Sequence, residues 1–168
     1  MNYVQCLLYL EKLGDEVVTM KFGLETIRTL LEKLGDPHTD YPSILIAGTN
    51  GKGSTACFLH SVFVACGIPC ALYTSPHLVC VEERLVVNGQ QIDPKTFAHY
   101  FTRVVEIIEE LGFSYHPTYF EILTAVAFLY FSEMKVQMAV LEVGMGGRLD
   151  STNIVNPILS VLTRVGFD

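Results

Sequence analysis

A glycine-rich segment at residues 47–55, AGTNGKGST, carries the residue types that bind a polyphosphate. Its three glycines leave the backbone amides of Gly48 through Ser54 open to phosphate oxygens, and Lys52 supplies a positive charge for the β- and γ-phosphates. An ordinary glycine-rich turn is the alternative interpretation. Because Lys and Ser stand at this spacing between a predicted strand and a predicted helix, a phosphate site is favoured.

The segment departs from the common phosphate loop, G-x-x-x-x-G-K-[ST], because Gly53 follows Lys52 and the hydroxyls come one residue later. A magnesium ion bound with the phosphates therefore needs a ligand from elsewhere in the chain. Two candidates stand at the ends of predicted strands: Ser75 follows the apolar run ALYT, and Glu142 interrupts AVLEVG.

An acid inside an apolar strand is unfavourable unless it meets a cation or hydrogen-bond donors. A buried salt bridge is one alternative for Glu142, but a nearby phosphate loop favours magnesium. Ligands gather at the carboxyl ends of parallel strands. We therefore predict a nucleotide–magnesium site in which Lys52 and Glu142 are the catalytic charged residues.

The elements that must position these residues follow from the hydrophobic pattern. Apolar runs predict core strands at 43–48, 69–74, 137–143 and 158–163. Helical periodicity and capping signals predict helices at 3–13, 24–34, 53–67, 94–111 and 119–134. Since 168 residues are about one domain's length, we predict a single α/β domain with a mostly parallel sheet and helices on both faces.

Three short signals define element ends more sharply than periodicity does. They are Asp93-Pro94 as N-cap and first helical residue, Thr118 with Glu121 as a capping box, and Asn88-Gly89 as the type I′ turn of a hairpin over 84–92.

The composition narrows the function classes. Hydrophobic residues make up 50% and charged residues 17%, which excludes a disordered chain. The net charge of −7 comes without a basic stripe, so nucleic acid is not an expected partner. The uncharged stretch from Thr55 to Thr74 is interrupted by His60, Gly67 and Pro69, so no membrane span is expected.

The cysteines indicate a reducing compartment. There are five, at 6, 57, 66, 70 and 80, mostly within apolar runs, and buried reduced thiols explain them better than disulfides or a zinc site. The N-terminus lacks the basic region of a signal peptide. We therefore expect a cytoplasmic protein.

Four strings in order, GTNGKGST, YTSPHLVCVEERLVVNG, TYFEILTAVAF and LEVGMGGRLDSTN, resemble the folylpolyglutamate synthase/dihydrofolate synthase branch of the Mur ligase family. With KFGLETIRTLLEKLGDP, the match covers nearly the whole chain. The resemblance implies the fold of a P-loop-containing Mur ligase central domain. It also implies an ATP-dependent ligase that phosphorylates the carboxylate of dihydropteroate or a reduced folate and joins the acyl phosphate to L-glutamate as an amide. The full-length protein is then expected to be monomeric.

The resemblance also implies roles for residues. Those expected to bind ATP are Thr49, Asn50, Gly51, Lys52, Gly53 and Ser54, and those expected to bind Mg²⁺ are Ser75 and Glu142. Those expected to hold the pterin are Lys21, Phe22, Thr118, Leu149, Asp150 and Ser151. The segment from Pro76 to Glu83 would cover the substrate, whereas His77 and Arg84 are equally well explained as surface residues.

In the family, the pattern continues past Asp168 with a histidine that binds a second magnesium, a carbamylated lysine and a C-terminal domain. We therefore expect residues 1–168 to be an incomplete N-terminal ATP-binding domain, without the C-terminal ligase domain and inactive alone. A stand-alone P-loop nucleotide-binding domain and a non-catalytic module that keeps an old fold are the alternatives.

Overall fold

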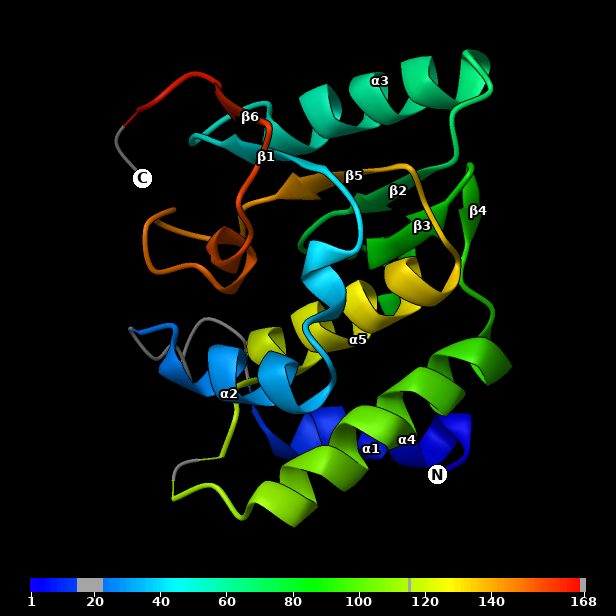
Figure 1. Cartoon of the computed structure of the whole chain (residues 1–168), viewed down its shortest axis with the longest axis vertical. Helices are drawn as coiled ribbons and strands as arrows, with labels where there is room; N and C mark the ends of the chain where they lie inside the picture. The colour runs from blue at the N-terminus through cyan, green and yellow to red at the C-terminus, as the bar shows by residue number, and fades with distance from the viewer. Residues whose placement is uncertain (15–22, 115, 167–168) are drawn as a thin grey trace.

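A six-stranded sheet with the order β4-β3-β2-β5-β1-β6 is the centre of this computed structural model, which describes residues 1–14, 23–114 and 116–166 (Figure 1). Its strands are β1 (Ser43–Ala47), β2 (Cys70–Tyr73), β3 (Leu85–Val87), β4 (Gln90–Gln91), β5 (Met138–Glu142) and β6 (Leu159–Leu162). The pairs β1–β5, β1–β6 and β2–β5 are parallel, and β3 and β4 add an antiparallel hairpin at one edge. The predicted fold class is confirmed.

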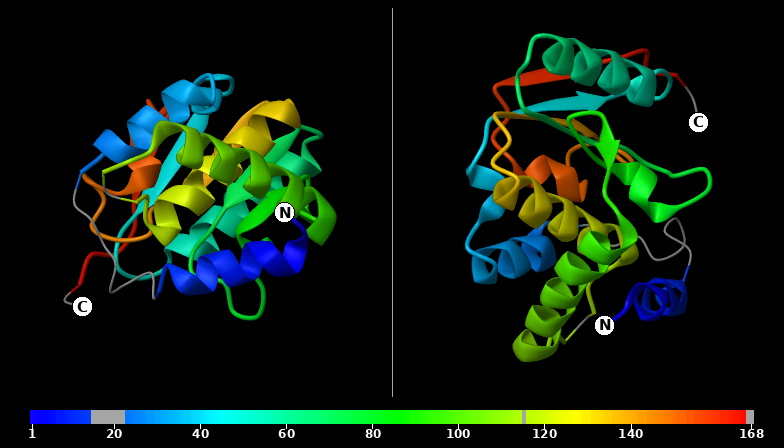
Figure 2. Two further views of the ribbon diagram at one scale, coloured as in Figure 1. Left: turned by 90° about the horizontal axis from the view of Figure 1, so that it is seen from below. Right: turned by 90° about the vertical axis from the view of Figure 1, so that its right-hand side faces the viewer.

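The two faces of the sheet are covered by different helices. Figures 1 and 2 show α3 (Lys52–Ala65) alone on one face, and α5 (Tyr119–Glu133) against the other. Behind α5 lie α2 (Glu25–Lys33) and α4 (Pro94–Leu111), and α1 (Tyr3–Lys12) packs on α4. Every residue of α5 from 121 to 131 is buried, which explains why its sequence is apolar on all sides.

Side chains alternate between the two faces along each strand, and this alternation sets the direction of Glu142. Ile46 and Val140 belong to the cluster under α3, whereas Leu141 belongs to the core around α5. Glu142 lies two residues after Val140 and opposite Ile46 in the β1–β5 ladder. It therefore faces α3.

The short sequence signals are confirmed. The carboxylate of Asp93 accepts hydrogen bonds from the amides of Lys95 and Thr96 at the start of α4, both at 3.0 Å. The amides of Thr118 and Glu121 each donate to the other's side chain, which completes the capping box of α5. Asn88 and Gly89 both have positive φ, 52° and 80°, as a type I′ turn requires.

Two expectations about burial were wrong. The segment 158–163 does contain β6, but β6 pairs only with β1 among the described residues and lies at the edge of the sheet. Ile158 and Leu162 are consequently 66% and 70% exposed. Of the five cysteines, which are all described and all unpaired, Cys57 and Cys66 are exposed rather than buried.

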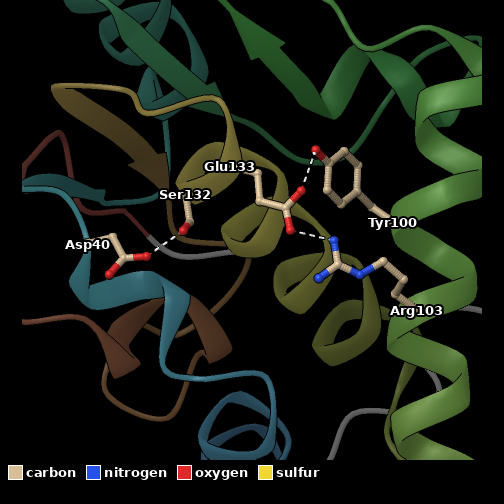
Figure 3. A network of polar contacts seen from close by, with 5 residues as sticks. All are labelled: Asp40, Tyr100, Arg103, Ser132 and Glu133. Carbon is tan, nitrogen blue, oxygen red and sulfur yellow. Dashed lines mark hydrogen bonds and ion pairs between the residues drawn. The ribbon is translucent and has the colours of Figure 1, made fainter.

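Polar contacts tie the C-terminal end of α5 to its neighbours (Figure 3). Glu133 pairs with Arg103 of α4 and accepts a hydrogen bond from the Tyr100 hydroxyl at 3.1 Å. Ser132 donates to Asp40, which follows the short 3₁₀ helix η1 (Pro37–Thr39). These contacts are partly exposed, so they orient α5 more than they stabilise it.

Within the described part of the chain, no helix is both long and apolar enough to cross a membrane.

Replacing Phe131 by Ala should lower the free energy of unfolding by about 3–5 kcal/mol, because this side chain is fully buried in the α5 core. Phe58→Ala is the matched control, since Phe58 is 73% exposed on α3 and should change stability by less than about 0.5 kcal/mol. Urea unfolding followed by circular dichroism measures both. Equal losses would contradict the assigned core.

Candidate functional site

The glycine-rich loop connects the end of β1 to the start of α3, as predicted. Gly48 has φ +135°, and a Cβ atom there would lie 2.1 Å from the hydroxyl oxygen of Thr163. The chain after β6 therefore approaches the loop so closely that only glycine fits. Gly51 is the N-cap of α3 with φ +83°, a left-handed conformation that glycine adopts without strain.

The amides of the loop do not all face outward, which corrects part of the expected phosphate cradle. Thr49 and Asn50 donate their N–H groups to the carbonyl of Arg164, at 2.9 and 3.3 Å. The first turn of a helix leaves its N–H groups without partners in the helix. In α3 these belong to Lys52, Gly53 and Ser54, and the Gly53 amide donates to the Glu142 carboxylate. The helix N-terminus, rather than the whole loop, therefore presents donors to anionic groups, of which this carboxylate is one.

Lys52 lines a cleft of about 320 Å³ at the carboxyl ends of β1, β5 and β6. Its ammonium donates to the carbonyl oxygens of Gly48, at 2.9 Å, and Thr49, at 3.4 Å. Gly144 to Gly147, Val165 and Gly166 also line it. A cation and glycine backbone in its lining make this cleft suitable for a phosphate chain.

Glu142 lies beside the start of α3, where the sequence placed it. Its side chain is 5% exposed, and its Oε2 accepts a hydrogen bond from the Ser75 amide at 3.1 Å. A Cβ atom on Gly53 would lie 3.4 Å from the same oxygen. Burial raises the pKa of the Glu142 carboxyl above its usual value, although the Ser75 amide and the Lys52 ammonium partly lower it.

Ser75 and Glu142 therefore meet, and their oxygen atoms suit a hard divalent cation. No cluster of three or more His, Cys, Asp or Glu side chains occurs in the part of the chain that the structure describes. A metal held by Ser75 and Glu142 would thus take further ligands from water and phosphate, as Mg²⁺ commonly does.

The structure describes four of the six residues expected to hold a pterin. Lys21 and Phe22 lie outside the described residues. Leu149 is 46% exposed, whereas Asp150 and Ser151 are buried at the start of the 3₁₀ helix η3 (Ser151–Ile154). Thr118 uses its hydroxyl to cap α5.

Asp150 already has partners within its own loop. Its carboxylate accepts from the amides of Met145 and Thr152, both at 2.9 Å, and burial raises its pKa. A Cβ on Gly144 would lie 3.1 Å from this carboxylate and 2.8 Å from the ring of Phe120. Gly144 thus marks the point where the start of α5 meets the loop after β5, and sequence reasoning missed Phe120 there.

Arg84 is a residue whose location, at the surface or in the interior, the sequence left open. It is 2% exposed, so the alternative that it is a surface residue is wrong. Its Nε donates to Nδ1 of His77 at 2.8 Å, and its guanidinium lies 5.4 Å from the centre of the Tyr119 ring. Arg84 thereby joins the segment after β2 to the start of α5.

The segment after β6 was also missed as part of the site. Besides the Arg164 carbonyl, Gly166 donates its amide to the Thr49 hydroxyl at 3.1 Å. Nothing in the residue types of 163–166 indicates binding, because their backbone makes these contacts. Only the parallel pairing of β6 with β1 brings them to the loop.

No protein-family profile matches the chain, but curated relatives do. A probable bifunctional folylpolyglutamate synthase/dihydropteroate synthase from Halobacterium salinarum is 46% identical over 147 residues, which are 86% of this chain and 18% of the relative. A dihydrofolate synthase/folylpolyglutamate synthase from Bacillus subtilis is 40% identical over 152 residues, which are 89% of this chain and 35% of the relative. The chain therefore spans between 18% and 35% of the length of these two relatives.

Solved structures match the fold. Folylpolyglutamate synthase from Thermotoga maritima has a TM-score of 0.91 at 42% identity, covering 98% of this chain and 38% of that one. A bifunctional folylpolyglutamate synthase/dihydrofolate synthase with Mn, AMPPNP and L-glutamate bound has a TM-score of 0.88 at 34% identity, covering 100% and 39%. E. coli FolC in complex with DHPP and ADP has a TM-score of 0.89 at 35% identity, covering 100% and 39%.

The fold and the Lys52 loop together define an α/β domain of the Mur ligase type. The chain is related in sequence and structure to the folylpolyglutamate synthase/dihydrofolate synthase family, as its motifs predicted, and it matches a part of each of these proteins.

Gly48→Ala should abolish nucleotide binding, because the new Cβ would clash with Thr163 and displace the loop from the end of β6. Gly67→Ala is the matched control: it also has positive φ, +74°, but open space around it, at the other end of α3. The control should lose only about 1–2 kcal/mol of stability. Binding of a fluorescent ATP analogue measures the difference, and intact binding by Gly48→Ala would contradict the close approach.

Proposed function

We propose that this chain forms the ATP-binding part of an ATP-dependent ligase that joins L-glutamate to the carboxylate of dihydropteroate or a reduced folate. One observation carries the proposal: Lys52, the first residue of α3, and Glu142, the last residue of β5, both stand at the α3 N-terminus, in a fold shared with enzymes of that name. Two solved relatives, one with Mn, AMPPNP and L-glutamate bound and one with DHPP and ADP, support the choice of ligands.

In the proposed reaction an oxygen of the substrate carboxylate attacks the γ-phosphorus of ATP. ADP leaves, and an acyl phosphate forms. The amino group of L-glutamate then attacks the acyl carbon, the carbon–oxygen bond to phosphate breaks, and inorganic phosphate and a proton are released. The Lys52 ammonium and the amides of Lys52 and Ser54 at the start of α3 would hold the phosphates and offset the charge that develops on them.

Ser75 and Glu142 would hold a divalent cation, which we take to be Mg²⁺. When bound, the ion would reduce the repulsion between the phosphates and the attacking carboxylate. The buried Glu142 suits this role, because a neighbouring cation would favour its charged form against the effect of burial. We assign the pterin to the region of Thr118, Leu149, Asp150 and Ser151, and the covering segment to Pro76–Glu83.

The proposal treats residues 1–168 as an ATP-binding domain that acts with a separate ligase domain. The exposed apolar side chains of Phe58, Ile158 and Leu162 support this part of the proposal, because a second domain packed on them would cover them. We place the protein in the cytoplasm, as a monomer that binds neither membrane nor nucleic acid. Its unpaired cysteines and its net charge of −7 support this placement.

Lys52→Ala in the complete gene product should lower ligation at least about a hundredfold, because it removes the ammonium beside the phosphates. Release of phosphate that depends on both glutamate and dihydropteroate or folate measures the reaction. Lys95→Ala, an exposed lysine at the start of α4, is the matched control and should keep full activity. A gene product that binds ATP but forms no amide would favour a stand-alone nucleotide-binding domain.

Glu142→Gln should raise the divalent-cation concentration needed for half-maximal nucleotide binding by at least about tenfold, while keeping the shape of the site. Glu106→Gln, an exposed carboxylate on α4, is the matched control. Titration of Mg²⁺ or Mn²⁺ against a fluorescent ATP analogue measures the effect. An unchanged cation requirement would remove Glu142 from the metal site.

A further inference from the structure

The segment between β2 and β3 has an unusual surface. At its tip the side chains of Leu78 and Val79 are 91% and 87% exposed, although both are large and apolar. The segment is closed at its base, where the amide of Thr74 donates to the carbonyl of Arg84 at 3.2 Å. It is therefore a loop with a defined base that holds two apolar side chains in solvent.

A single carboxylate organises the tip of this loop. Glu83 accepts hydrogen bonds from three successive amides: Leu78 at 2.7 Å, Val79 at 2.9 Å and Cys80 at 3.0 Å. Successive amides turned to one point commonly bind an anion, and here the anion belongs to the loop itself. Bonds of this kind to an ionised acceptor are stronger than those between neutral groups. The same amides, that of Leu78 first, hold the pKa of the Glu83 carboxyl below its usual value.

Arg84, the next residue, is the buried contact of this loop. Arg84 is buried, donates to the ring of His77 and lies over Tyr119 at the start of α5. Glu83 thus binds amides at the tip of the loop, and Arg84 binds a side chain of the loop and packs on α5. At the loop's first end, outside the three amides that Glu83 binds, Ser75 donates its amide to Glu142.

We propose that Glu83 is a positioning residue whose carboxylate preforms the loop, so that Leu78 and Val79 are presented to the folate or pteroate substrate before it arrives. This inference rests on the proposed function. A loop that is already ordered does not lose conformational freedom when the substrate binds, which favours affinity. Glu83 would therefore act on substrate binding and not on the phosphoryl transfer itself.

The clamp itself is tested without any substrate. In Glu83→Gln the amides of Leu78, Val79 and Cys80 should exchange with solvent at least about tenfold faster than in the unmodified chain, measured by NMR. Glu106→Gln on α4 is the matched control and should leave these rates unchanged. Unchanged exchange in Glu83→Gln would overturn the clamp.

Kinetics of the complete gene product test the positioning role. Glu83→Gln should raise KM for the folate or pteroate substrate about tenfold, while kcat and KM for ATP stay within about twofold. Leu78→Ser with Val79→Ser removes the apolar tip but keeps the clamp, and should raise the same KM without faster amide exchange. A uniform loss of kcat would overturn the positioning role in favour of a merely structural one. An unmodified protein without ligase activity would overturn the proposed function and the kinetic half of this inference, whereas the exchange result would still stand.

Discussion

The parallel pairing of β1 with β5 is the constraint on which the candidate site depends. The ladder places Glu142 opposite Ile46, so an acid at the end of β5 lies just before the loop that leaves β1. Alternation then turns the carboxylate toward α3, and Gly53 at the start of α3 leaves room for it. A shift of one residue in this register would turn Glu142 into the α5 core, where it would be buried without these partners.

Three of the buried charged side chains, Glu142, Asp150 and Arg84, are satisfied in different ways. Glu142 has the Ser75 amide and the Lys52 charge, Asp150 has amides of its own loop, and Arg84 has His77 and an aromatic ring. Burial of an ionised group is tolerated only with such partners. The carboxyl of Glu142 differs from the others because one of its charged neighbours, Lys52, lines the cleft at the carboxyl ends of the strands.

A second constraint is the close approach of other segments to the backbone of two glycines. The chain after β6 approaches Gly48 so closely that no side chain would fit there. Phe120 and Asp150 approach Gly144 in the same way, so glycine is required at both positions. These two glycines therefore serve the close packing of the segments that follow the strands. This explains why Thr49 and Asn50 direct their amides to Arg164 instead of the cleft.

Much of the fold could be predicted from the sequence, because its signals are local. The cap at Asp93, the box at Thr118 and the turn at Asn88-Gly89 depend on residues within a few positions, and all three form as predicted. The meeting of Ser75 with Glu142 could also be predicted, since both follow apolar runs whose carboxyl ends share one edge of the sheet.

Other features depend on which segments become neighbours, and only the tertiary structure decided those. β6 is apolar in sequence like a core strand, but its place at the sheet edge leaves it exposed. Arg84 is charged like a surface residue, but its position between His77 and Tyr119 buries it. Apart from the Thr163 hydroxyl, residues 163–166 contact the glycine loop through their backbone, which carries no sequence signal. Local chemistry thus determined the elements and the types of reactive residue, and strand order determined which of them share a site.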